Sequence, residues 1–177
     1  MNFNYQKELV RIWENSVELY QSGNISAEIF PIQDEIPFLQ MIGLNKMDIF
    51  DFVEDWVCEG TPDLATFLLI HDIRRDFFIE EQKGIPSLKI LDSRMLPGKT
   101  EALNEIVWLP RVIQKAQAKL HGELSKDTMF CCGGDRAFFE RNDIHPAEFL
   151  RIVQKSKQDD QLILEWVVKR IKSSQKN

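Results

Sequence analysis

The same order of apolar positions, glycines and helix-start residues occurs in both halves of this chain, and this repetition restricts the fold more than any other feature of the sequence. Gly23-Asn24-Ile25-Ser26 matches Gly122-Glu123-Leu124-Ser125, and further along Phe38-Leu39 matches Phe138-Phe139. Helical periodicity alone can produce scattered matches, but it does not place glycines and helix-start residues in the same order. We therefore predict two diverged copies of one structural unit.

Each copy carries the pattern of four helices. In the first half, apolar residues recur at intervals of three and four over residues 5–21 and 46–58, as in amphipathic helices. Asp34 is expected to cap a short helix between them, and Thr61-Pro62-Asp63 to begin a fourth with Thr61 as its cap. The predicted fold class is all-α, with two diverged copies of a four-helix unit packed together. The tryptophans occupy apolar helical positions and are expected in the core: Trp13, Trp56, Trp108 and Trp166.

The second copy follows a segment with a different pattern. Residues 84–100 alternate short apolar runs with proline and glycine, which predicts a loop. A helical pattern then extends from about Glu101 to His121 and contains Pro110, so the chain either starts a new helix there or is kinked. The predicted domains are an N-terminal helical repeat (1–84), a connector (85–100) and a C-terminal helical repeat (101–177).

Charge and hydropathy argue against several classes of function. The net charge is −6, and the first half is acidic whereas the second is basic, so nucleic acid is a poor partner for the first half. Opposite charges favour contact between the halves or between molecules, and we expect a homo-oligomer or a protein partner. The sequence shows neither a secretory signal nor an apolar run near the ~20 residues of a membrane span. A cytoplasmic protein that does not enter membranes is expected.

One helix of the second half carries regularly spaced basic residues. Arg111, Lys115 and Lys119 lie four residues apart and therefore on one side of that helix. Such a stripe could bind a phosphate-bearing ligand or an acidic protein surface. Charged outer helix faces are common, so we favour a solvated face.

The cysteines offer a second candidate site. Cys131-Cys132 precede Gly133-Gly134-Asp135, where a helix is expected to begin, and a thiol beside a helix start can become a nucleophile. Most buried cysteines are inert, and an acceptor at Asp135 would weaken the positive potential there, so inert thiols are favoured. A disulfide between adjacent cysteines would be strained, and we expect reduced thiols.

Signals for metal or familiar catalytic sites are weak. A ligand set of His121, Cys131, Cys132 and His145 lacks the paired spacing of zinc sites. His71 lies on an inner helical stripe and is expected to be a core histidine. The sequence has no phosphate loop, dinucleotide fingerprint or nucleophile elbow. We expect no metal and no cofactor, and whether the chain is an enzyme stays open.

Residues 107–122 read VWLPRVIQKAQAKLHG, with a leucine-proline-arginine start, a lysine-alanine-x-alanine-lysine helix and a closing glycine. This segment resembles a family of small bacterial proteins known only as domain of unknown function 5069. The resemblance continues through Cys132-Gly133-Gly134-Asp135 and covers about residues 95–170, although Gly133-Gly134 stands where a proline-containing turn is usual. It implies a bacterial source and supplies no catalytic residues.

The sequence leads to two main hypotheses on function. The first is a helical binding or protein-interaction module, because the repeat is present and catalytic motifs are missing. The alternative is a small-molecule enzyme or thiol-dependent regulator that uses the turn of Cys131, Cys132 and Asp135. A third, nucleic-acid binding by the basic second half, should depend steeply on salt. The candidate ligand-binding residues are Arg111, Lys115, Lys119, Cys132 and Asp135.

Overall fold

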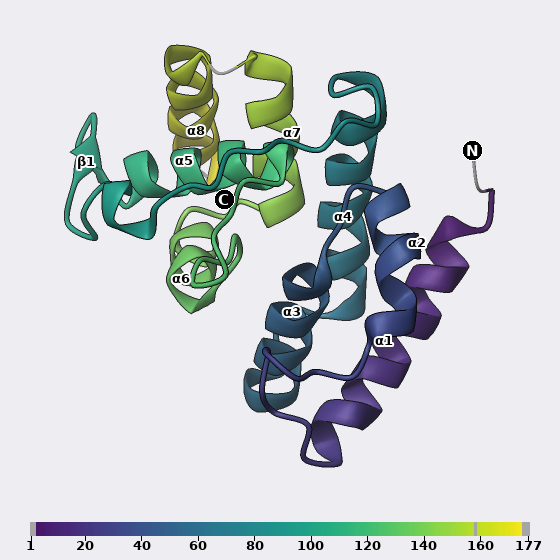
Figure 1. Cartoon of the computed structure of the whole chain (residues 1–177). Helices are drawn as coiled ribbons and strands as arrows, with labels where there is room; N and C mark the ends of the chain where they lie inside the picture. Colours follow the sequence, from purple (N-terminus) through teal and green to yellow (C-terminus); the bar gives the residue numbers. More distant parts are fainter. Residues whose placement is uncertain (1–2, 158, 175–177) are drawn as a thin grey trace. The chain divides into compact units, whose positions relative to one another are not determined.

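The computed structural model describes residues 3–157 and 159–174 (Figure 1). This part of the chain contains eight α-helices and one pair of two-residue strands, so the prediction of a helical fold is confirmed. The chain divides into an N-terminal unit (residues 1–84) and a C-terminal unit (residues 85–177), and each is described by itself.

The N-terminal unit is built around its first helix. This helix, α1 (Tyr5–Gln21), buries Leu9, Trp13 and Ser16 on the stripe predicted from the sequence. A 3-10 turn (Gln33–Glu35) leads into the short second helix. The remaining helices of the unit are α2 (Ile36–Met41), α3 (Lys46–Glu59) and α4 (Leu64–Glu80). Both α3 and α4 pack against α1.

Helix α3 begins and ends with local signals that fix its length. The side chain of Asn45 accepts the N–H of Asp48, and the carboxylate of Asp48 accepts the N–H of Asn45, so the two residues form a capping box. At the other end, Gly60 adopts a left-handed conformation with φ of 73° and ends the helix.

Two predicted caps in this unit are wrong. Asp34 lies inside the 3-10 turn before α2 and makes no cap. Asp63 caps α4 by accepting the N–H of Thr66 at 2.8 Å, whereas Thr61 had been expected to do so. The helix starts after Asp63 because Asp63 has the extended backbone that an N-cap residue needs.

The core of the N-terminal unit is aromatic. Trp13 and Phe67 lie 4.5 Å apart between ring centroids, and Phe67 and His71 lie 4.2 Å apart. His71 is 1% exposed and its Nδ1 lies 2.7 Å from the carbonyl oxygen of Phe67, so the predicted core histidine is confirmed. Among the tryptophans only Trp13 is buried; the other three are partly exposed, and the prediction for them is wrong.

The C-terminal unit starts with an extended segment and a small hairpin. Leu91 donates its N–H to the carbonyl of Glu123 at 2.6 Å, so the segment is bound to this unit rather than free. It contains one 3-10 turn (Ser93–Met95) and precedes the antiparallel strands β1 (Ala102–Leu103) and β2 (Ile106–Val107). The helices that follow are α5 (Leu109–His121), α6 (Gly133–Arg141), α7 (Pro146–Ser156) and α8 (Asp160–Ser174). Helix α7 packs against α5 and α8.

The predicted start of the second-half helix near Glu101 is wrong. The N–H of Trp108 donates to the carbonyl of Glu101 at 3.0 Å and closes the hairpin, and α5 begins at Leu109. Pro110 then stands in the first turn, where its missing N–H costs nothing. Of the two alternatives for Pro110, a new helix rather than a kink is therefore correct.

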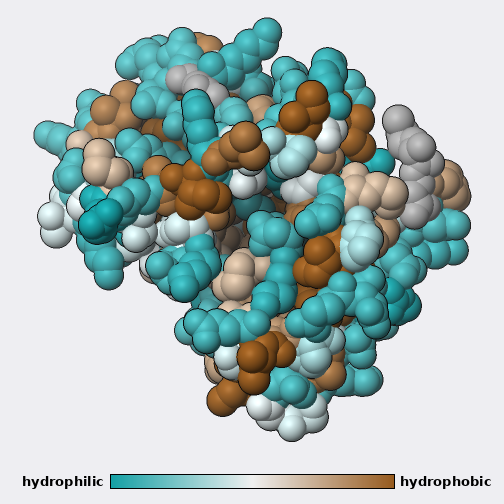
Figure 2. All heavy atoms as spheres, in the orientation of Figure 1, coloured by the Kyte–Doolittle hydropathy of each residue, from teal (hydrophilic) through white to brown (hydrophobic). Residues whose placement is uncertain are grey.

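The face shown in Figure 2 is mostly hydrophilic, with scattered apolar groups. Some of the most exposed apolar side chains belong to residues 85–95, where Leu88 is 97% exposed and Met95 73%. No helix in the described residues is long and apolar enough to cross a membrane.

Candidate functional site

A fully buried carboxylate lies at the start of α6 in the C-terminal unit. Asp135 is 0% exposed, and Lys115 Nζ lies 2.5 Å from its Oδ2. The indole N–H of Trp108 donates to Oδ1 at 2.9 Å, and the backbone N–H of Cys131 donates to Oδ2 at 2.9 Å. A buried charge is costly unless it is paired and hydrogen-bonded, and Asp135 satisfies both conditions.

The ammonium of Lys115 also contacts a thiol. Its Nζ donates to Cys132 Sγ at 3.1 Å, and Cys132 is the partly exposed N-cap residue of α6. Lys115 itself is only 3% exposed. The structure therefore brings Lys115, from the predicted basic stripe, to Cys132 and Asp135, from the predicted turn. We call these three residues the thiol cluster.

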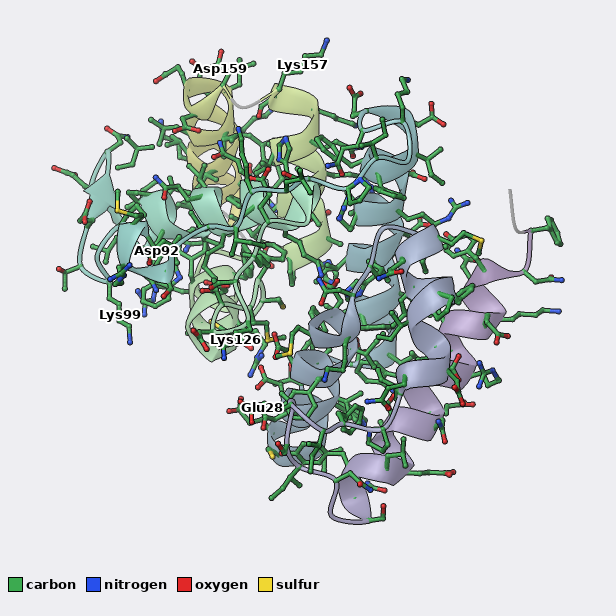
Figure 3. All side chains as sticks on the ribbon, viewed as in Figure 1. Glu28, Asp92, Lys99, Lys126, Lys157 and Asp159 are labelled. Carbon is green, nitrogen blue, oxygen red and sulfur yellow. The ribbon has the colours of Figure 1, made fainter. Side chains whose placement is uncertain are left out.

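The prediction of a solvated basic face on α5 is wrong for Lys115 and Lys119. Their exposed fractions are 3% and 2%. Helix α5 contacts both α7 and β1, and its neighbouring residues Val112 and Ala116 are fully buried. Because other elements surround α5, its basic side is covered as well as its apolar side. In contrast to these two lysines, Lys126 in the loop before α6 is exposed to solvent (Figure 3).

The two adjacent cysteines differ in environment. Cys131 is fully buried, as the inert interpretation predicted, and burial raises the pKa of its thiol to about 12, with a further contribution from the charge of Asp135. The Cys131 thiol therefore stays protonated, and the backbone N–H of Cys131 donates to the Asp135 carboxylate. Cys132, in contrast, contacts the Lys115 ammonium, caps α6 and is partly exposed.

The backbone around the thiol cluster is strained. Trp108 and Cys131 both have left-handed conformations, with φ of 76° and 75°. Such conformations cost about 1–3 kcal/mol in residues other than glycine and occur often at functional sites. Both residues donate to Asp135, so the buried carboxylate holds both turns in place.

Close packing against Trp108 explains one of the two glycines that begin α6. A Cβ built on Gly134 would lie 2.5 Å from the Trp108 ring, which leaves no room for a larger residue. From its spacing, Trp108 had been predicted in the core. Its role as a donor to Asp135 was missed, because the sequence carries no signal for the partner of an indole N–H.

The remaining candidates lie beside the thiol cluster rather than in it. The guanidinium of Arg111 stacks 5.7 Å from the Trp108 ring centroid, and its Nη1 donates to the carbonyl of Pro97 at 2.7 Å. Lys119 lies one turn beyond Lys115 on α5. Arg136, which was not predicted, is buried and donates to the carbonyl of Cys131 at 2.8 Å, so it fixes the other side of that turn.

In the described residues, no three histidine, cysteine or acidic side chains are grouped so that they could hold a metal ion. His121 Nδ1 lies 2.8 Å from the carbonyl oxygen of Gln117, and His145 Nδ1 accepts the N–H of Ala147. An open groove of about 710 Å³ runs along α8 and is lined by residues such as Leu164 and Val168. The thiol cluster does not line it.

The segment that contains the thiol cluster matches a known family model. No curated protein and no solved structure matches the chain. The resemblance predicted from the sequence is confirmed, because residues 95–177, which contain the whole thiol cluster, match the family described as "Domain of unknown function (DUF5069)".

Proposed function

We propose that this chain is a thiol-dependent regulator whose C-terminal unit reacts with small oxidants or electrophiles through Cys132. The contact of 3.1 Å between Lys115 Nζ and Cys132 Sγ carries this proposal. A thiolate is the reactive form of cysteine, and a neighbouring cation and a helix start both stabilise it. The partial exposure of Cys132 gives a small reagent access.

Asp135 has a positioning role in this proposal. It forms an ion pair with Lys115 while Trp108 and Cys131 donate to it, so the ammonium is held at the thiol by buried contacts. Sites fixed by such a supporting layer need little rearrangement when a ligand arrives. Arg111, beside Trp108, is our candidate for binding the polar group of a reagent.

Alkylation with iodoacetamide near neutral pH, read out by mass spectrometry of each cysteine, tests the proposal. Cys132 should react much faster than free cysteine and faster than Cys58, which is exposed and serves as an internal control. Cys131 should not react in the folded protein. Equal rates at Cys132 and Cys58 would contradict the proposal.

A second candidate function is protein interaction, with another copy of this chain as the partner. Four large apolar side chains within residues 85–95 support it because they are more than half exposed: Ile85, Leu88, Ile90 and Met95. Sedimentation velocity should then show an oligomer that Leu88→Asp dissociates. A wild-type chain that sediments as a monomer at high concentration would exclude it.

We also propose that the two units are diverged copies, comprising residues 1–84 and 101–177 with a connector between. Each unit has a long first helix, α1 or α5, that packs against its third, α3 or α7. Phe30 and Phe130 are buried at equivalent points before the second helix. Superposition of experimental structures of the two units should give the same helix order and crossing directions, and different crossings would refute duplication.

We also propose that the chain is a cytoplasmic protein of bacterial origin, as the resemblance of its second half to a bacterial family and its free cysteines suggest. Fractionation of a bacterium that carries the gene should recover the chain with cytoplasmic markers, and recovery with periplasmic markers would oppose this proposal.

A further inference from the structure

We propose that Cys132 is a covalent modification site at which oxidation by hydrogen peroxide leads to a bond between Cys132 Sγ and Lys115 Nζ. This inference rests on the proposed function, because it uses the same thiol. It adds the product and the second reacting group, and it makes the thiol cluster a reversible switch.

The first step oxidises the sulfur. The thiolate of Cys132 attacks one oxygen of peroxide, the O–O bond breaks, and the sulfur becomes a sulfenic acid, S–OH. The hydroxide that leaves takes up the thiol proton and becomes water. Peroxide is reduced and Cys132 is oxidised by two electrons, so no other reagent is needed.

The second step joins sulfur to nitrogen without further oxidation. Lys115 first transfers one proton from its ammonium to Asp135 Oδ2, which lies 2.5 Å from Nζ. The free amine then attacks Sγ, the S–O bond breaks, and the hydroxide that leaves takes a second proton from nitrogen and becomes water. The product is a sulfenamide, S–NH, the same bond that sulfenic acids form with backbone nitrogen.

Lys115 competes well with the other nucleophile beside Cys132. The Cys131 thiol is buried, and a pKa raised to about 12 keeps it protonated and a poor nucleophile. A disulfide between adjacent residues would also be strained. Lys115 Nζ, in contrast, is already in contact with Sγ and has a proton acceptor at hand.

The bond would change the surroundings of Asp135. Lys115 loses its positive charge, so the buried carboxyl group loses its cationic partner and keeps the proton that Lys115 transferred to it. Its hydrogen bonds from Trp108 and Cys131 then weaken, because neutral acceptors bind donors less strongly than carboxylates. The strained turn at Cys131 should loosen, and its backbone N–H should exchange faster with solvent.

Treating the purified full chain with hydrogen peroxide and digesting it without reduction tests the inference. Tandem mass spectrometry should find the peptides of Lys115 and Cys132 joined, with the loss of two hydrogens and release by dithiothreitol. Lys115→Arg keeps a cation but should give no link. Cys131→Ala should keep the link, and circular dichroism must show that both variants are folded.

Several results would overturn the inference. These are a Cys131–Cys132 disulfide, an oxygen retained between sulfur and nitrogen, or oxidation of Cys132 without any link. Fast alkylation of Cys132 together with any of them would reject the sulfenamide alone and leave the proposed function standing. Slow alkylation would reject the proposed function as well. If Lys115→Arg does not fold, Cys131→Ala tests the inference, because that variant keeps Lys115 and cannot form the disulfide. A Lys115–Cys132 link in Cys131→Ala supports the sulfenamide, and no link refutes it.

Discussion

Replacing Lys115 with methionine should destabilise the C-terminal unit much more than replacing an exposed lysine. The substitution removes the ammonium that lies 2.5 Å from the fully buried carboxylate of Asp135. Loss of one partner of a buried ion pair typically costs about 3–5 kcal/mol. Because Trp108 and Cys131 still donate to the carboxylate, we expect the lower end, about 3 kcal/mol.

Urea unfolding of the full chain, followed by circular dichroism, measures this loss. With a slope of about 2 kcal/mol per molar urea, the midpoint of the C-terminal unit should fall by roughly 1.5 M. Lys126→Met is the matched control, since Lys126 is exposed, and should change the free energy of unfolding by less than about 0.5 kcal/mol.

A double variant separates charge from packing. Lys115→Met with Asp135→Leu removes both charges, so it should recover part of the loss, although two donors are left without an acceptor. If Lys115→Met costs no more than Lys126→Met, the reasoning about a buried pair is refuted.

Three further predictions concern other contacts. Burial raises the pKa of Cys131 from 9.0 to about 12, so the folded state holds the thiol proton more tightly than the unfolded state. The free energy of unfolding should therefore fall between about pH 9 and 12, and it should fall less in Cys131→Ala. Urea titrations at alkaline pH measure this, and an identical fall in the variant would contradict it. Gly134→Ala should cost about 1–3 kcal/mol in thermal unfolding because its Cβ meets the Trp108 ring, and an unchanged midpoint would argue against that packing. Asn45→Ala should cost about 1 kcal/mol through the lost capping box, measured in the same way, and a neutral effect would mean that the cap does not stabilise α3.

The long amphipathic helices could be predicted because periodicity extends over several turns. Apolar spacing over residues 5–21 and 46–58 predicted α1 and α3. Caps were less predictable, because several neighbouring residues can serve. Thr61 and Asp63 are both good acceptors, and only the backbone conformation decides between them.

The hairpin before α5 escaped prediction for a physical reason. Its strands have two residues each, which is too short for an alternating pattern to appear. The residues at its turn, Asn104 and Glu105, have positive φ angles without a glycine, so the usual signal of a tight hairpin is missing.

The sequence predicted Cys132 and Asp135 together as one candidate turn, but it did not connect Lys115 to them. A spacing of four shows that Lys115 and Lys119 share one side of a helix, but it does not show what covers that side. The partner of Lys115 lies 20 residues away in sequence, at the start of another helix. Such a contact depends on how α5 and α6 pack, which no local pattern encodes.

A high-resolution crystal structure of the reduced full chain would test the central claim most directly, by measuring where Lys115 Nζ lies. We predict hydrogen-bond contact with both Cys132 Sγ and Asp135, with the side chain shielded from solvent. A Lys115 side chain extended into water, with Asp135 bound only by backbone and indole donors, would contradict the account.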